Sequence, residues 1–397
     1  MRLPFLSRAA ETPTLEQKKS ALAPLIAISS AGRVVWSARD TVALTRSGFT
    51  TNPIGFRAVK LIIEAAAAVP LVLQDGERRY EQHPMLSLVR RPNPAQGRAE
   101  LFEALFGQLL LSGNAYIEAV VGQSRLPAEL HVLRSDRMSI VPGVDGWPEG
   151  YEYSVGGRKH RFIIGEGMSP ICHVKNFHPQ DDHYGLSPLQ AAAAAIDVHN
   201  SASAWSKALL DNAARPSGAI VYRGGDGQST LSQDQYDRLL VELEASHMGA
   251  RNAGRPMLLE GGLDWKPMGF SPSDMEFHKT KEAAAREIAV SFGVPPMLLG
   301  IPGEATYANY QEANRGFYRL TVLPLVSRVT AALAHWLSEF AGEELDLRPD
   351  LDQLPALSQE RETQWRRVSD ADFLTNMEKR ALLGLPKVSD EDARDEQ

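Results

Sequence analysis

Apolar residues recur at helical spacing in several parts of this chain. In the segment 52–68, the residues at that spacing are Phe56, Val59, Ile62, Ile63 and Ala66. Apolar side chains three and four positions apart line one face of a helix, so this segment is predicted to be an amphipathic helix. The same pattern predicts helices at 83–91, 99–112, 187–212, 232–246, 273–292, 309–340, 358–368 and 370–383. Pro324 lies inside the long segment 309–340, where it predicts a kink.

Short apolar runs bounded by Gly, Pro and Asp predict strands between these helices. The first is 69–74, and a meander of strands follows the helix at 99–112. The strands of this meander are expected at 115–121, 129–133, 138–141, 151–155 and 161–164, and the unit ends near 171–174. Further strands are predicted at 219–222, 256–260, 263–268 and 345–348. The chain is therefore expected to have an α+β fold.

Two of the predicted helices begin with capping residues and contain alanine clusters. Ser187 and Pro188 are typical of a helix start, Gln190 can complete a capping box, and the run 191–195 is all alanine. The second helix begins at Ser273-Asp274-Met275-Glu276 and contains the cluster 283–285. Alanine favours helix formation by itself, and its small side chain also lets two helices pack closely. Between these two helices the pattern predicts a compact βαββ module.

The second of these helices carries a polar face and is followed by a polar loop. The charged residues of the face are Lys279, Lys281, Glu282 and Arg286. A break at Gly293-Val294-Pro295-Pro296 separates the helix from the loop at 300–310, in which Glu304 is the only charged residue. A solvated helix surface explains the charges, and so does the wall of a water-filled channel.

Composition narrows the class of protein. With 397 residues, 43% of them hydrophobic, the chain can form two or three domains or one elongated subunit. Its net charge of −7 argues against a clamp that grips DNA of any sequence, because such proteins carry a surplus of Lys and Arg. A channel along which DNA slides is compatible with this charge, as is an ordinary acidic protein. Residues 1–45 are interpreted as a weakly ordered arm.

The sequence offers little evidence for catalysis, a metal or a membrane span. The single cysteine, Cys172, permits no internal disulfide. His173, His178 and His183 are spaced by five with two aspartates between them, which is more typical of a polar loop than of a metal site. The glycine-rich stretch 224–230 lacks the lysine of a phosphate-binding loop. The longest apolar run, 65–73, is shorter than the roughly 20 residues needed to cross a bilayer. We therefore expect no enzyme activity, no metal, no cofactor and no membrane contact.

The order of these parts resembles the portal proteins of long-tailed phages, prophages and gene transfer agents. The resemblance covers roughly 53–347. It rests on the α+β unit, the Tyr184-Gly185-Leu186-Ser187-Pro188-Leu189 helix start, the inserted module, the second capped helix and the Val294-Pro295-Pro296-Met297-Leu298-Leu299-Gly300 break with its polar loop. It implies a wing at 46–185, stem helices at 186–213 and 273–297, a clip at 214–272, a tunnel loop at 298–312, a kinked helix returning to the wing at 313–357, and a short helical crown with an acidic tail at 358–397.

In this family such a subunit forms a ring, most often of twelve copies, through which double-stranded DNA is packaged and ejected. The resemblance implies location at the portal vertex of a virion or virus-like particle, and terminase, a head-tail adaptor and the major capsid protein as partners. The implied channel-facing loop residues are Ile301, Pro302, Gly303, Glu304, Ala305, Thr306, Tyr307, Ala308 and Asn309, beside the polar stem face. Two alternatives stay open at this point: a structural ring or scaffold without DNA passage, and a hydrolase whose site is not evident.

Overall fold

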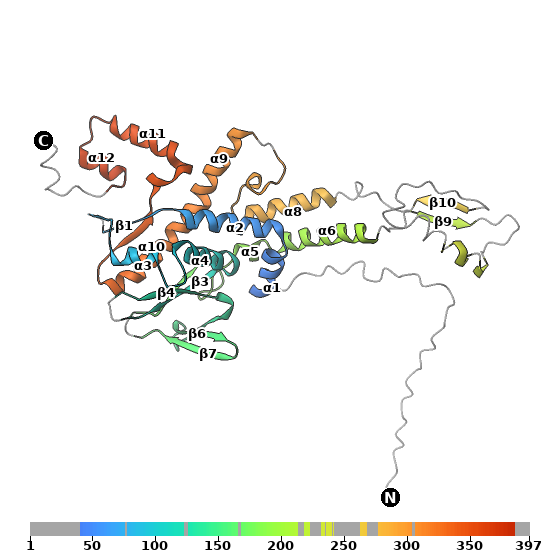
Figure 1. Cartoon of the computed structure of the whole chain (residues 1–397), viewed down its shortest axis with the longest axis horizontal. Coiled ribbons are helices and arrows are strands. Elements are labelled where there is room, and N and C mark those ends of the chain that lie inside the picture. The colour runs from blue at the N-terminus through green and yellow to red at the C-terminus, as the bar shows by residue number, and fades with distance from the viewer. Residues whose placement is uncertain are drawn as a thin grey trace, which may run out of the picture. The chain divides into compact units, whose positions relative to one another are not determined.

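The computed structural model describes residues 40–75, 78–122, 126–165, 168–212, 218–222, 232–234, 236–239, 241, 263–267, 277–303 and 306–385 (Figure 1). Most of the predicted arm 1–45 lies outside these residues. Helix α1 spans Thr41–Thr45 and is capped by the carboxylate of Asp40, which accepts from the Ala43 amide at 2.9 Å. The chain is therefore already helical four residues before the predicted boundary of the arm.

The next helices along the chain follow the predicted ranges closely. After a π-helical turn, η1 (Arg46–Thr50), they are α2 (Pro53–Ala68), α3 (Pro84–Arg90) and α4 (Arg98–Ser112). The side chain of Asn52 caps α2, and Gly113, with φ 78°, ends α4 in the left-handed conformation. Phe56 is an exception to the predicted apolar face of α2. Its side chain is 46% exposed and packs against the ring of Phe49.

The strands form separate small antiparallel sheets, so the prediction of one meander is wrong. One sheet has the order β4-β3-β8, with β3 at Asn114–Val120, β4 at Glu129–Leu133 and β8 at Ile171–Lys175. A second has the order β5-β6-β7, with β5 at Met138–Pro142, β6 at Pro148–Val155 and β7 at Arg158–Ile163. The 3-10 turn η2 (Ser135–Arg137) separates β4 from β5 along the chain. Local patterns locate strands, but they do not show that β3 pairs with a strand that follows some 50 residues later.

A third sheet joins strands that are far apart in the sequence. Its order is β11-β1-β2, with β1 at Leu71–Gln74, β2 at Arg79–Tyr80 and β11 at Asp346–Pro349. Leu71 pairs with Pro349 and Gln74 with Asp346, so the chain returns to the wing some 270 residues after leaving β1.

The two alanine-rich helices are present. The first begins with α5 (Pro188–Ala191) and, after an irregular position at Ala192, continues as α6 (Ala193–Asn212). The second is α8 (Phe277–Ser291), and its predicted start at 273–276 lies outside the described residues. Of the module between them, β9 (Gly218–Tyr222) pairs antiparallel with β10 (Leu263–Pro267). The predicted strand 256–260 and most of the predicted helix 232–246 fall outside the described part of the chain.

A long helix carries the chain back to the wing. It consists of α9 (Tyr307–Phe317), a π-helical turn η5 (Tyr318–Val322) and α10 (Leu323–Ala341). The irregularity expected at Pro324 takes the form of this turn just before the proline. A π turn contains an extra residue, so it rotates the apolar face. Phe317 is buried, whereas Tyr310 and Leu320 are 52% and 71% exposed.

This helix is also the one described segment, Tyr307–Ala341, that is long and apolar enough to cross a membrane. No membrane-spanning segment was expected from the sequence, because only uninterrupted apolar runs were considered. This helix was therefore missed, since its apolar residues are interleaved with polar ones. Val326, Val329, Leu333 and Leu337 of α10 are almost fully buried in the main hydrophobic core. The packing is therefore that of a core helix.

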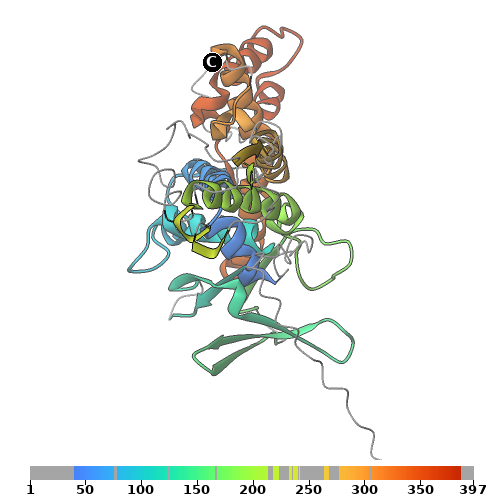
Figure 2. The ribbon, with the colours of Figure 1, turned by 90° about the vertical axis from the view of Figure 1, so that its right-hand side faces the viewer.

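The C-terminal helices lie at one end of the helical body and the β5-β6-β7 sheet at the other (Figure 2). After the 3-10 turns η6 (Leu351–Gln353) and η7 (Pro355–Leu357), these helices are α11 (Ser358–Ser369) and α12 (Asn376–Leu382). The second begins six residues later than predicted, because Thr375 forms a capping box with Glu378. The main core packs α2, α4 and α10 together, and a smaller core of Tyr116, Met138, Tyr151, Phe162 and Ile171 joins the two sheets of the wing.

Candidate functional site

The junction that leads into α5 is held by close backbone contacts. Ser187 caps α5, its hydroxyl accepting from the Gln190 amide at 3.0 Å, as predicted. The Tyr184 hydroxyl accepts from the Ile140 amide at 2.9 Å. A Cβ on Gly185 would lie 2.2 Å from the carbonyl oxygen of Gly113, so no larger residue fits there without a shift. The junction therefore fastens the start of α5 to strand β5 and to the end of α4.

Two asparagines that the sequence reasoning missed complete this junction. The Asn114 carboxamide accepts from the Gly185 amide at 2.8 Å and donates to the Gly185 and Ser112 carbonyls. Asn176 donates to the carbonyls of Leu109 and Leu186 and accepts from Arg328 of α10 at 2.7 Å. The Gly113-Asn114 pair directly after a predicted helix was the one sequence signal available for them.

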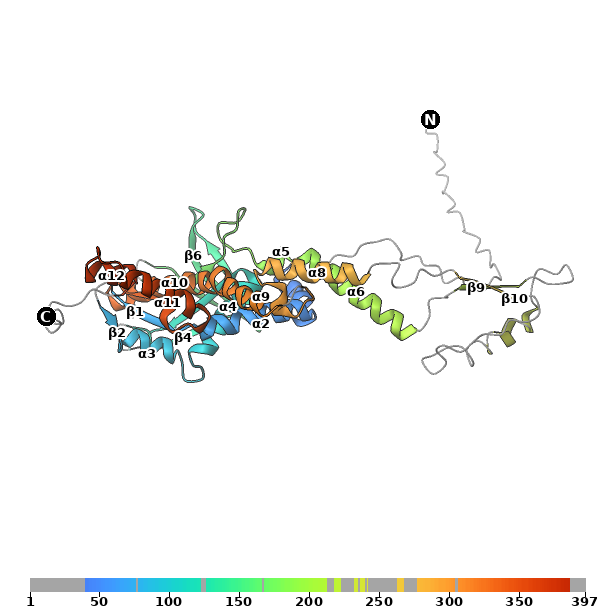
Figure 3. The ribbon, with the colours of Figure 1, turned by 90° about the horizontal axis from the view of Figure 1, so that it is seen from above.

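Helices α6 and α8 lie side by side in both views (Figures 1 and 3). The small residues expected to permit this packing are divided between the core and the surface. Ala192, Ala193, Ala284, Ala285 and Ala289 are at most 6% exposed. Ala191, Ala194 and Ala283 are exposed. Each alanine cluster therefore has one buried and one open side.

A buried polar network ties α6 to the start of α2. The Asn52 carboxamide nitrogen lies 3.2 Å from His199 Nδ1 and donates to Asn200 Oδ1 at 2.9 Å. Because the Asn52 oxygen accepts from the Gly55 amide, its nitrogen must be the donor to His199, which makes Nδ1 an acceptor and the ring neutral. Burial lowers the pKa of His199, and the charge of Lys281 lowers it further.

The charged residues predicted to form the polar face of the stem interact with two different parts of the structure, α6 and the loop after α8. Lys279 is exposed, whereas Lys281, Glu282 and Arg286 are half-buried. Lys281 acts electrostatically on His199 of α6. Glu282 and Arg286 instead form an ion pair of 2.9 Å beside the loop that follows α8. The four residues therefore do not share a single solvent-facing surface.

The loop after α8 is fixed at its first residues. The 3-10 turn η4 (Pro296–Leu299) ends at Gly300, whose φ is 74°, and Ile301 then turns inward. Ile301 is 7% exposed and packs against Ala285 and Ala289 of α8. The prediction that Ile301 faces a channel is therefore wrong, since this side chain anchors the loop.

A second contact holds the same loop to α8. The guanidinium of Arg286 donates to the carbonyl oxygen of Pro302, and its Nη2 lies 3.9 Å from where a Cβ on Gly303 would stand. The same guanidinium nitrogen donates to the carboxylate of Glu282 at 2.9 Å. Pro302 and Gly303 are exposed, so they project from an anchored base.

The second half of the predicted tunnel loop is partly helical. Glu304 and Ala305 lie outside the described residues. Thr306 caps α9, its hydroxyl accepting from the Asn309 amide at 3.2 Å. Tyr307, Ala308 and Asn309 are exposed but form the first turn of that helix, so their assignment to a loop is wrong. The physical reason is the Thr306 cap, which begins the helix two residues earlier than the apolar spacing indicated.

The histidines near the junction lie among ring-stacking and hydrogen-bonding contacts within the fold. His173 stacks on Tyr116 with ring centroids 4.3 Å apart, and its Nε2 lies 3.1 Å from Asn114 Oδ1. Burial and the charge of Lys175 lower the pKa of His173 to about 4. Asp181 accepts from the amides of His183 and Tyr184. Among the described residues, no three His, Cys, Asp or Glu side chains are grouped to hold a metal ion.

The sequence and the fold of this chain are similar to those of known proteins. A chain in the neck of a native gene transfer agent particle, computed with C12 symmetry, is 69% identical with a TM-score of 0.72, and the match covers 91% of this chain and 97% of that one. A chain in the virion of a native gene transfer agent particle is 68% identical, again with a TM-score of 0.72 and coverage of 91% and 98%. The probable portal protein of Streptomyces phage phiC31 is 26% identical over 79% of this chain and 71% of its own length. The model of the phage portal protein family matches residues 53–384, and the chain therefore belongs to the phage portal protein family.

Proposed function

We propose that this protein is the subunit of a portal ring through whose channel double-stranded DNA enters and leaves a virion or gene transfer agent particle. The observation that carries the proposal is the anchored loop. Ile301 and Arg286 hold its base on the α8 surface, so Pro302 and Gly303 project from a rigid helix pair. The near-complete match to a chain in a neck with C12 symmetry supports a ring of twelve copies.

The charge of the loop suits DNA that must slide. Glu304 is the only charged residue between 300 and 310, so the loop offers no cation to a phosphate. Proteins that hold DNA tightly neutralise several phosphates with Lys or Arg, which would oppose movement. The loop and the first turn of α9 would therefore touch DNA through steric and weak polar contacts.

Further partners follow from the same proposal. Terminase and then a head-tail adaptor would dock on the clip at 214–272, and the major capsid protein would surround the wing. The subunit would work mechanically, without catalysing a reaction and without a cofactor. Neither a scaffold without DNA passage nor a hydrolase receives specific support from the described residues.

A charge-reversal variant of the loop tests the proposal. Replacing Glu304 and Thr306 with lysine should impede DNA movement by adding attraction to phosphate, while the ring still assembles. The matched control is Glu362→Lys with Thr363→Lys on α11, where both positions are exposed. The loop variant should lower the DNA content of particles and the control should not. Equal DNA content in both would show that the loop does not approach DNA.

A further inference from the structure

A basic hollow of about 360 Å³ lies on the wing, away from the stem and the loop. It is bordered by strands β1 and β2, the end of α3, and the start of α4. The side chains that line it include Arg79, Arg90, Arg98, Tyr80, Glu81 and Gln353. Three of these six carry a positive charge and one carries a negative charge.

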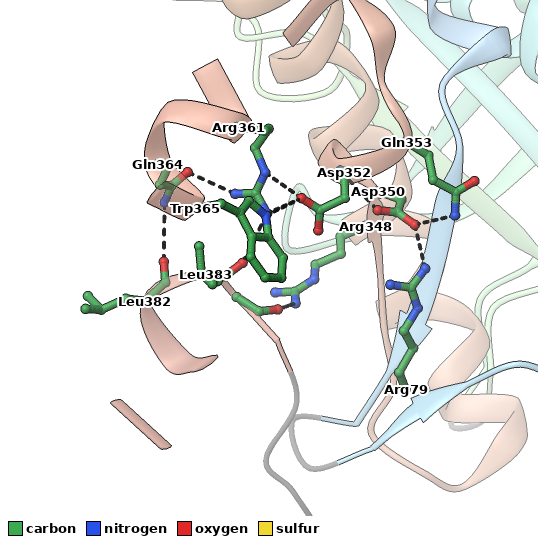
Figure 4. A network of polar contacts seen from close by, with 11 residues as sticks. Arg79, Arg348, Asp350, Asp352, Gln353, Arg361, Gln364, Trp365, Leu382 and Leu383 are labelled. Atoms are coloured by element: carbon green, nitrogen blue, oxygen red, sulfur yellow. Dashed lines mark hydrogen bonds and ion pairs between the residues drawn. The ribbon is translucent and has the colours of Figure 1, made fainter. Parts of the chain in front are cut away.

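The arginines of the hollow differ in what they contact. Arg79 donates to the buried carboxylate of Asp350 at 2.5 Å and is thereby neutralised (Figure 4). Half-buried Arg98 donates to the Val69 carbonyl at 3.2 Å. Among the described residues, neither Arg98 nor Arg90 forms an ion pair, and Glu81 at the rim is exposed. Two cations therefore share a recess without a carboxylate between them.

The two guanidinium groups repel each other across the hollow, in which Arg98 is half-buried and Arg90 is exposed. Burial lowers the pKa of Arg98, and the neighbouring charge of Arg90 lowers it further. A guanidinium has five donors arranged to fit a carboxylate, and here one donated hydrogen bond is seen. The hollow thus has the charge, the donors and the volume for one or two carboxylates.

The C-terminal end of the described chain leads to the border of this hollow. Arg348 donates to the Gly384 carbonyl at 2.7 Å, and Arg361 donates to the Leu383 carbonyl at 3.3 Å (Figure 4). Leu385 lines a neighbouring recess, and that recess shares Val72 and Arg79 with the basic hollow. Leu385, the last described residue, therefore lies in a recess next to the hollow.

The residues that follow are acidic. Between 386 and 397 there are five carboxylates, Asp390, Glu391, Asp392, Asp395 and Glu396, and two cations, Lys387 and Arg394. Asp390 is five positions after Leu385, so an extended chain can carry that carboxylate roughly 17 Å. We propose that the hollow is a carboxylate-binding site and that the acidic stretch 390–396 of the same chain occupies it through Arg90 and Arg98.

The tether favours this occupant over other anions. A group attached to the protein by a few residues has an effective concentration in the millimolar range or above. A free phosphate or an acidic partner must compete with that concentration. The site therefore fastens the end of the chain to the wing. This role is separate from the DNA contact that we propose for the loop.

A spin label on the tail tests the proposal in the full-length protein. The label is attached to Ala393→Cys. Natural Cys172 is buried and burial raises its thiol pKa to about 12, so it does not react under native conditions. The spectrum should contain an immobilised component. That component should be lost in Arg90→Gln/Arg98→Gln and in 1 M sodium chloride, which screens the ion pairs.

Two further variants keep the test decisive. Arg91→Gln removes an exposed arginine beside α3 that does not line the hollow, and it should retain the immobilised component. The triple variant Asp390→Asn/Glu391→Gln/Asp392→Asn leaves the hollow intact, and its spectrum should lack the immobilised component. A mobile label in the otherwise unchanged protein would overturn the proposal, even if the hollow then bound inorganic phosphate. Equal immobilisation in the Arg90/Arg98 and Arg91 variants would overturn it as well.

Discussion

The guanidinium of Arg286 on α8 donates a hydrogen bond to the carbonyl oxygen of Pro302, and so joins the stem helix to the loop that follows it. Glu282, one helical turn earlier, fixes the same guanidinium at 2.9 Å. Movement of α8 would therefore be transmitted to the exposed residues of the loop.

Replacing Arg286 with Gln should impair DNA packaging and leave assembly intact. The side chain is 41% exposed and lies outside the main core, so its loss should change the free energy of unfolding by no more than about 0.5 kcal/mol. The measurement is the DNA content of particles beside the mass of the purified ring. Lys279→Gln, on the exposed part of the same helix, is the control. A packaging defect of equal size in both variants would argue against a specific role for the Arg286 contact.

Replacing Gly185 with Ala should destabilise the junction between wing and stem. The new Cβ would lie 2.2 Å from the Gly113 oxygen and 2.6 Å from the Asn176 nitrogen, both of which are backbone atoms that cannot rotate away. Overpacking of this kind costs about 1–3 kcal/mol. Gly107→Ala is the matched control, because its Cβ would meet nothing within 4 Å and a glycine inside α4 lowers helix stability by about 0.5–1 kcal/mol. Urea unfolding should shift in opposite directions for the two variants.

The free energy of unfolding should fall as the pH is lowered from about 6.5 to about 4. Burial favours neutral His173, so the unfolded chain binds a proton at a higher pH than the folded chain does. Stability from this residue is complete above the unfolded pKa and is lost below it, by about 3 kcal/mol at the acid end. His173→Gln should show a correspondingly smaller decrease between pH 7 and pH 4.5 in urea unfolding. An identical pH profile for the variant would exclude His173 as a source of the dependence.

Replacing Tyr116 with Phe should leave stability unchanged or raise it by about 1 kcal/mol. The Tyr116 hydroxyl is buried and has no hydrogen-bond partner among the described residues. Burial raises the pKa of this phenol, which therefore stays protonated. Removal of the hydroxyl relieves a desolvation cost and keeps the ring stack with His173. A clear decrease in the melting temperature of Tyr116→Phe would show that the hydroxyl has a partner after all.

The sequence predicted the local elements of this fold better than their long-range arrangement. The Asn52 side chain, Gly113 and the Ser187 hydroxyl begin or end helices through contacts with nearby residues, so their helices were placed within a few positions. The pairing of Tyr116 on β3 with His173 on β8 depends on residues 57 positions apart, which no local pattern reveals.

The same distinction applies to the site. Composition identified a polar loop, but the burial of Ile301 depends on its packing against Ala285 and Ala289 of α8. Asn114 and Asn176 were missed because their side chains donate to backbone carbonyls far away in the sequence. The bond from Asn52 to the Asn200 side chain likewise joins distant residues. The order of the predicted parts indicated the function, and no cluster of catalytic residues was needed for that inference.

Electron microscopy of the purified full-length protein tests the central proposal most directly. Averaged end-on views should show a closed ring with twelve-fold symmetry and an open axial channel, with the loop at 300–306 at the channel wall. Stable monomers at micromolar concentration in both low and high salt would contradict the account, and so would rings whose axis is closed by protein.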